Sequence, residues 1–205
     1  MAYPTVSAPY GLKPVNLIGG QVFAGATRMM EIASTSNVGY GTSIFYGDLV
    51  KRVTSGTIEL DAGTATATPC GVFLGVSFTN SNGQVQQQQF YPASQSIKSG
   101  TKIFAVVADD PDTLFQVVSC SATTTVAGMG IAAIGSNIAL IQNAGSTTTG
   151  NSAVAIDEGT QNTTSSLPIR IIDVVRETAT GADTFVEFIV KINATMHQYN
   201  NSTGI

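Results

Sequence analysis

Residues 184–192 read TFVEFIVKI, and this stretch decides the fold class. Every second residue is apolar, which places one apolar row on one face of a β-strand. That row is Val186, Phe188, Val190 and Ile192. The opposite row mixes charged and apolar side chains, so this face is open to burial against a partner chain. Its members are Phe185, Glu187, Ile189 and Lys191. We predict a strand with one fully buried face.

Strand-length pieces of the same kind recur through the chain from residue 28 onward. They are rich in β-branched and aromatic residues and are bounded by turn formers. We predict strands at residues 28–33, 43–52, 57–60, 70–79, 84–91, 102–108, 114–119, 138–141, 169–177 and 184–192. Turn dipeptides such as Asn82-Gly83 and Ser99-Gly100 lie between them. This spacing predicts an all-β fold, a sandwich or barrel-like domain of many short antiparallel strands.

The first 27 residues differ in texture from the rest of the chain. Pro4, Pro9 and Pro14 prevent a stable helix and favour extended backbone. We therefore divide the chain into an N-terminal arm (1–27) and a β-rich domain (28–205). The arm either docks on a neighbouring subunit or covers its own domain. Its candidate contact residues are Tyr3, Tyr10, Leu12, Val15, Leu17, Ile18 and Phe23.

Two polar tracts inside the β-rich domain have alternative interpretations. Residues 143–166 form a long stretch of Thr, Gly, Ser and Asn, which predicts a loop that is flexible by itself or ordered against a neighbour. Gln86 to Gln89 place four consecutive amides within a predicted strand. They favour a solvated edge strand over an interface ladder of side-chain hydrogen bonds.

The composition narrows the class of function. Only 11% of the 205 residues are charged, whereas a soluble monomer carries about a quarter. Much of the surface is therefore expected to be covered by other protein. The net charge of −4 opposes nucleic-acid binding. The chain has no apolar run of membrane-helix length, and its start lacks the pattern of a signal peptide. We expect neither a nucleic-acid nor a membrane partner.

Cysteine and acidic residues give few signs of a metal site. Cys70 and Cys120 lie far apart in the sequence, and we expect two buried thiols rather than one bridge. Asp109, Asp110 and Asp112 resemble the start of a hard-cation loop. They lack the further acids of such a loop, and Asp-Pro commonly begins a turn, so we expect an acidic turn and keep these residues as weak metal candidates.

Enzyme motifs are absent or out of context. Residues 128–133 match the dinucleotide motif GxGxxA, but no acidic residue follows at the required distance, so we expect a short apolar helix or turn. His197 is the only histidine, near a C-terminus that looks flexible, and we expect it at a surface or interface. Acids such as Asp61, Asp173, Glu177, Asp183 and Glu187 leave a glycosidase-type pair open. We predict no enzyme activity and no cofactor.

Several strings resemble one known family. The opening Ala8-Pro9-Tyr10-Gly11-Leu12-Lys13-Pro14-Val15 with Leu17-Ile18-Gly19-Gly20 resembles small head proteins of marine and freshwater tailed phages. Agreement extends from about Tyr3 to Tyr199. The other strings are Tyr46-Gly47-Asp48, Gly71-Val72-Phe73-Leu74-Gly75, Ala108-Asp109-Asp110-Pro111-Asp112, Gly150-Asn151-Ser152 and His197-Gln198-Tyr199. The chain therefore resembles the capsid cement, or head decoration, proteins of cyanophages and related podoviruses.

The resemblance implies a function without an active site. A β-rich and trimeric subunit would bind the outside of the major capsid protein shell and stabilise the expanded head. Its partners would be the major capsid protein and two further copies of itself. It would be made in the host cytoplasm and end on the virion exterior. The alternative is a receptor- or glycan-binding module of a virion fibre or surface adhesin.

Overall fold

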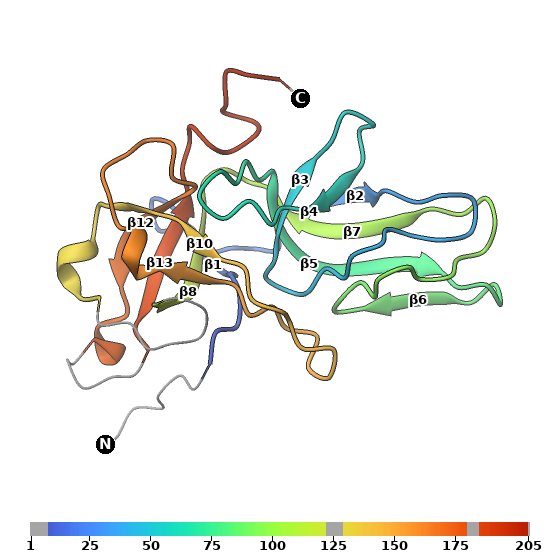
Figure 1. Cartoon of the computed structure of the whole chain (residues 1–205), viewed down its shortest axis with the longest axis horizontal. Helices are drawn as coiled ribbons and strands as arrows, with labels where there is room; N and C mark the ends of the chain where they lie inside the picture. Colours follow the sequence, from blue (N-terminus) through green and yellow to red (C-terminus); the bar gives the residue numbers. More distant parts are fainter. Residues whose placement is uncertain (1–7, 122–128, 180–184, 205) are drawn as a thin grey trace.

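The computed structural model describes residues 8–121, 129–179 and 185–204. The fold is all-β, as predicted, and its described helices are single 3-10 turns of three residues each. Two sheets lie side by side along the long axis of the molecule (Figure 1). None of the helical turns in these residues approaches the length and hydropathy of a bilayer-crossing helix.

The six-stranded sheet occupies the right half of Figure 1 and is built from residues 28–108. Its strands are β2 (Arg28–Ile32), β3 (Leu49–Arg52), β4 (Ile58–Leu60), β5 (Gly71–Thr79), β6 (Val85–Gln88) and β7 (Ile103–Ala108). Their order is β3-β4-β2-β7-β5-β6, and β3 also pairs with β5. Five strands therefore form a nearly closed barrel, in which β2 and β4 pair only at Ile32 and Ile58, while β6 extends the sheet beyond it. Inward-facing residues such as Phe73, Ile103 and Ala105 fill the barrel.

The seven-stranded sheet occupies the left half of the molecule (Figure 1). Its strands are β1 (Lys13–Leu17), β8 (Thr113–Cys120), β9 (Asn137–Ile138), β10 (Leu140–Ile141), β11 (Ala155–Asp157), β12 (Ile169–Val174) and β13 (Glu187–Ile192). The order is β10-β11-β8-β13-β12-β9, with β1 antiparallel to β8. The apolar row of β13 is buried, which confirms the prediction from its alternation.

Most predicted strands are present, but two strands were not expected. β1 lies within the predicted N-terminal arm and pairs with β8, so this part of the arm covers its own chain. β11 lies within the predicted loop 143–166 and pairs in parallel with β8. Val154, Ala155 and Ile156 are buried there. The loop prediction was wrong for these residues because three apolar side chains suffice to seat a strand on an existing sheet.

Other sequence predictions can be compared directly. Within residues 8–121, 129–179 and 185–204, β6 is an edge strand that pairs with β5 alone, as its glutamines indicated. Cys70 and Cys120 are buried thiols, and burial raises their pKa values to about 12 and about 11. Residues 131–133 form the expected short helical turn, whereas Gly128 lies outside the described residues.

Candidate interaction surfaces

The first joint between the two sheets is made by the strings at residues 46–48 and 150–152. The Tyr46 N–H donates to the Gly150 carbonyl (3.0 Å), and the Ser152 N–H donates to the Tyr46 carbonyl (2.9 Å). The Leu12 N–H donates to the Gly47 carbonyl (3.0 Å). Gly47 has a φ of +95°, and a Cβ there would lie 2.9 Å from the Leu12 nitrogen. Only glycine fits this joint without strain.

Asp48 stabilises the same joint from inside. It is 1% exposed, and its carboxylate accepts hydrogen bonds from the Ser152 hydroxyl (2.6 Å) and the Phe45 N–H (2.7 Å). Burial raises the pKa of Asp48, and the hydrogen bonds lower it in part. The carboxylate links its own segment to Ser152 and has a partner on each oxygen. It is a structural group.

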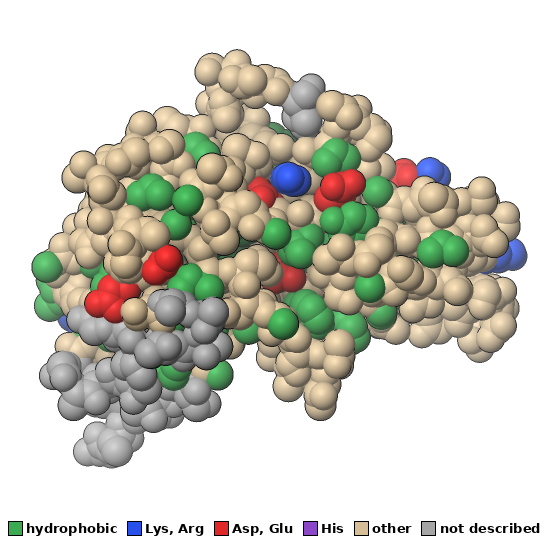
Figure 2. All heavy atoms as spheres, in the orientation of Figure 1, with side chains coloured by type: hydrophobic (Ala, Val, Ile, Leu, Met, Phe, Trp, Pro, Cys, Tyr) green, Lys and Arg blue, Asp and Glu red, His purple; other side chains and the backbone are tan. Residues whose placement is uncertain are grey.

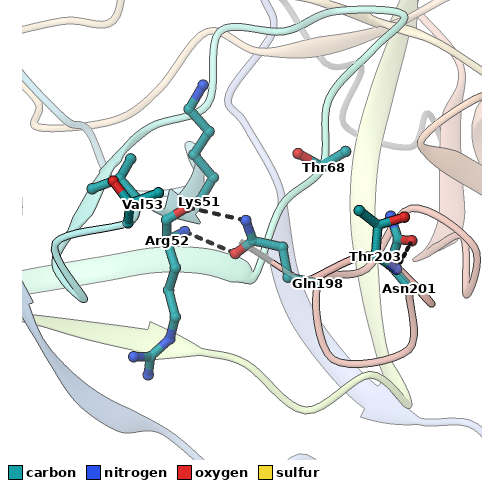
Figure 3. Close-up of a pocket in the computed structure, with 9 residues that line it drawn as sticks. Lys51, Arg52, Val53, Thr68, Gln198, Asn201 and Thr203 are labelled. Carbon is teal, nitrogen blue, oxygen red and sulfur yellow. Dashed lines mark hydrogen bonds between the residues drawn. The ribbon is translucent and has the colours of Figure 1, made fainter.

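The second joint is made by the C-terminal segment after β13, residues 193–204, which we call the tail. The Gln198 side chain accepts from the Arg52 N–H (2.8 Å) and donates to the Arg52 carbonyl (3.1 Å). The Gln198 N–H donates to the Pro69 carbonyl (3.0 Å). Figure 3 shows these two hydrogen bonds between the Gln198 amide and the Arg52 backbone, with the Arg52 side chain extending away from them. The Gln198 side-chain amide therefore satisfies both backbone groups of Arg52 at the end of β3.

His197 lies inside this joint. It is 0% exposed, and its Nδ1 accepts the Tyr199 N–H (3.2 Å). The prediction that His197 lies at a surface or interface was wrong, because the tail folds back onto β3 and the ring is buried within the chain. Burial is the main cause that lowers the pKa of His197, and Lys191 adds to this effect, while Asp109 and Asp110 oppose it. Its Nε2 is buried without a hydrogen-bond partner in the described residues.

The acidic turn connects β7 to β8, as expected for Asp-Pro. Its three carboxylates serve different partners: Asp109 binds Arg28 (3.0 Å) and the Tyr199 hydroxyl (2.6 Å), and Asp110 accepts the Asp112 N–H (2.8 Å). Asp112 binds Lys191 (2.6 Å). No cluster of three or more metal-ligating side chains is found among the described residues. The side chains of the turn therefore contact β2, β13 and the tail.

The other strings behind the family resemblance are also structural. Gly71 approaches β7 so closely that a Cβ would lie 2.4 Å from the Ala108 carbonyl oxygen. The strings at residues 46–48, 150–152 and 197–199 all form contacts between the two sheets. They fix the relative placement of the sheets, and their partners lie within the chain.

The candidate contact residues of the arm divide into covered and open positions. Leu12 is fully buried in the core, and Val15, Leu17 and Phe23 are half-buried. The Tyr10 hydroxyl donates to Glu187, and burial raises the pKa of Tyr10. Ile18 is 46% exposed at the end of a hairpin that the Asn16–Val22 bridge closes. Tyr3 lies outside the described residues. Of the six candidates that the structure describes, Ile18 is the one whose side chain is exposed.

Two of the pockets were considered as ligand sites, and neither has a lining that indicates a particular ligand. A cavity of about 430 Å³ lies between β3 and the tail, lined by residues such as Lys51, Thr68 and Asn201 (Figure 3). A second, of about 250 Å³, contains Asp48 and Phe45. The Phe45 ring stacks on Phe90 (5.4 Å between centroids), and a Cβ on Gly145 would lie 2.4 Å from the ring. With Phe90 and Gly145 already packed on it, this ring is poorly placed to serve as a sugar platform.

The acids considered for a glycosidase pair also have structural partners. Asp61 is 3% exposed and accepts the Gly63 and Thr68 N–H groups, and Glu187 accepts the Tyr10 hydroxyl. The Asp173 carboxylate accepts a hydrogen bond from the Val174 N–H, beside the bulge in β12. Asp183 lies outside the described residues. These contacts bring no two of the acids together.

The surface itself is the remaining candidate. Figure 2 shows a face dominated by uncharged side chains and backbone, on which acidic and basic side chains are few. Large apolar side chains are exposed on it and elsewhere, including Val22 (77%), Val85 (69%) and Met29 (58%). The sequence analysis missed these three, because exposure of single apolar residues has no periodic signal. The glutamine tract was the one signal that could have indicated the edge beside Val85.

No family model, curated protein or solved structure matches this chain.

Proposed function

We propose that this protein is a virion structural subunit that binds the outside of a major capsid shell and stabilises the expanded head. The observation that carries the proposal is the low charge of the surface. The chain has 22 charged residues, 9 basic and 13 acidic, and three of the acids, Asp48, Asp61 and Asp109, are buried in joints and turns. A surface left to Ser, Thr, Asn, Gln and isolated apolar residues suits lasting contact with other protein.

The architecture supports a structural role. Glycines without room for a Cβ and buried hydrogen bonds hold the two sheets together at two joints. A rigid subunit loses little entropy on binding, so more of its contact free energy remains as affinity. The family resemblance points to the same role, and the strings that carry it lie largely at these joints.

The mechanism is mass action on assembly. A subunit that binds the expanded shell and not its precursor stabilises the expanded state by its binding free energy. At a free concentration of 100 times Kd this amounts to about 2.7 kcal/mol per site. Three copies joined about a threefold axis engage neighbouring capsomers together, so weak single contacts give a lasting attachment.

The test is co-sedimentation of the purified protein with expanded shells that lack it. We expect saturable binding, with precursor shells as the matched control that binds less. A protein that ignores both shells contradicts the proposal. Retention on host cells or surface polysaccharide without shells would favour the fibre or adhesin module instead.

A further inference from the structure

The outer edge of β6 is open. Among the described residues, β6 pairs with β5 on one side only. In the connecting turn the Asn80 N–H donates to the Gln84 carbonyl (2.9 Å). Because bonded and non-bonded positions alternate along an antiparallel ladder, Val85 and Gln87 turn their backbone groups away from β5. Both side chains are exposed.

The edge of β2 is open as well. β7 pairs with the whole length of β2, whereas β4 pairs with it only at Ile32. The Ala33 N–H donates toward the β4 side, to the Ile58 carbonyl (3.5 Å). By the same alternation, Met29 turns its backbone N–H and carbonyl to that side, at a position where β4 does not pair with β2. A groove of about 460 Å³ lies there, between Glu31 and the turn at residues 55–57.

The four-residue β6 edge has no charge, proline or bulge to prevent pairing, whereas the β2 edge carries two charged residues. Natural edge strands are guarded by lysine, proline, bulges or inward charges. Residues 84–91 contain no charged residue and no proline. The two charges of β2 are already bound within the chain, Arg28 to Asp109 and Glu31 to Lys102 (2.6 Å). Val85 and Met29 place two of the most exposed large apolar side chains of the described residues on these two edges.

We propose that β6 of one copy pairs with the β2 edge of the next copy. On both edges the outward-turned backbone groups belong to residues whose side chains lie on the outer face of the sheet. Edge-to-edge pairing therefore satisfies the open backbone groups and places Val85 beside Met29 of the next copy. Two different edges make a head-to-tail contact, which gives a closed ring when the rotation closes. The inference rests on the proposed function only for the number of copies, three.

The experiment uses the full-length chain and light scattering. Val85→Lys places a charge on the β6 edge, and Met29→Lys places one on the β2 edge. Thr79→Lys is the matched control, since Thr79 pairs with Val85 one strand further in and adds the same charge away from the edge. We expect a stable oligomer for the unchanged chain and for Thr79→Lys, and a single chain mass for each edge variant with unchanged circular dichroism.

Mixing the two edge variants distinguishes this contact from others. The Met29→Lys copy keeps an intact β6 edge and the Val85→Lys copy an intact β2 edge, so the mixture should form a species of two chain masses. A monomeric unchanged chain overturns the proposal, as does an oligomer that Met29→Lys leaves intact or a mixture that stays monomeric. Shell binding by the single-chain variants, with lower apparent affinity, would leave the proposed function standing even if the ring does not form.

Discussion

The two sheets differ in how many apolar side chains and strand edges they leave exposed. On the seven-stranded sheet, β1 pairs with β8 and the Tyr10 hydroxyl donates to Glu187, and the large exposed apolar side chains of this half, such as Val22 and Ile131, lie in the connecting segments rather than on the strands. The six-stranded sheet leaves Met29, Phe104 and Val85 exposed and two edges open. The difference indicates a division of work. Under the proposed function, one sheet and the joints would hold the subunit together, and the other would present the surface for assembly.

The largest effect should come from the covered sheet. Phe188 is fully buried in β13, so Phe188→Ala should lower the free energy of unfolding by about 3–5 kcal/mol. Phe104 on β7 is 39% exposed, and Phe104→Ala should cost much less. Urea denaturation of both variants measures the contrast. Equal losses would contradict the division between the sheets.

The N-terminal segment contains the same contrast within a few residues. Leu12→Ala removes a core side chain and should cost about 2–5 kcal/mol. Ile18→Ala changes an exposed position and should stay within about 0.5 kcal/mol. Thermal unfolding compares them. A free arm would make both substitutions neutral, so a neutral Leu12→Ala would show that the segment does not dock as described.

The joint between the sheets should be sensitive at Gly47. Gly47→Ala forces a side chain into a positive φ and against the Leu12 nitrogen, for an expected loss of about 1–3 kcal/mol. Gly56 has a similar φ (+81°) with open space around its Cβ position, so Gly56→Ala reports the backbone cost alone. The excess loss of Gly47→Ala over Gly56→Ala measures the joint. No excess would mean that the two segments separate at little cost.

The tail joint should respond to pH. The pKa of His197 is lowered in the folded state, so the unfolded chain takes up a proton first as pH falls. The stability that His197 contributes is complete above about pH 6.5 and is lost as pH falls toward the lowered pKa, at no more than about 1.4 kcal/mol per pH unit. His197→Asn keeps an acceptor near the Nδ1 position and should remove this slope between pH 6.5 and 5. An identical slope in both proteins would assign it to other groups.

The sequence predicted where the strands lie better than it predicted which segments they pair with. The alternation in residues 184–192 was sufficient for β13 because its period is set locally by side-chain direction. β11 was not predicted, because Ala155–Asp157 forms a strand by pairing with β8, a contact that the local sequence does not encode. The burial of His197 was not predicted for a similar reason, since it comes from β3 and the acidic turn. The open edge of β2 depends on the single pairing of Ile32 with Ile58, which no local pattern encodes.

The most direct test of the central claim is the heat resistance of expanded shells at increasing concentrations of this protein. The account predicts a disruption temperature that rises with concentration and saturates when the binding sites fill, because ligand binding stabilises the bound state by mass action. A disruption temperature that stays constant at every concentration would contradict it.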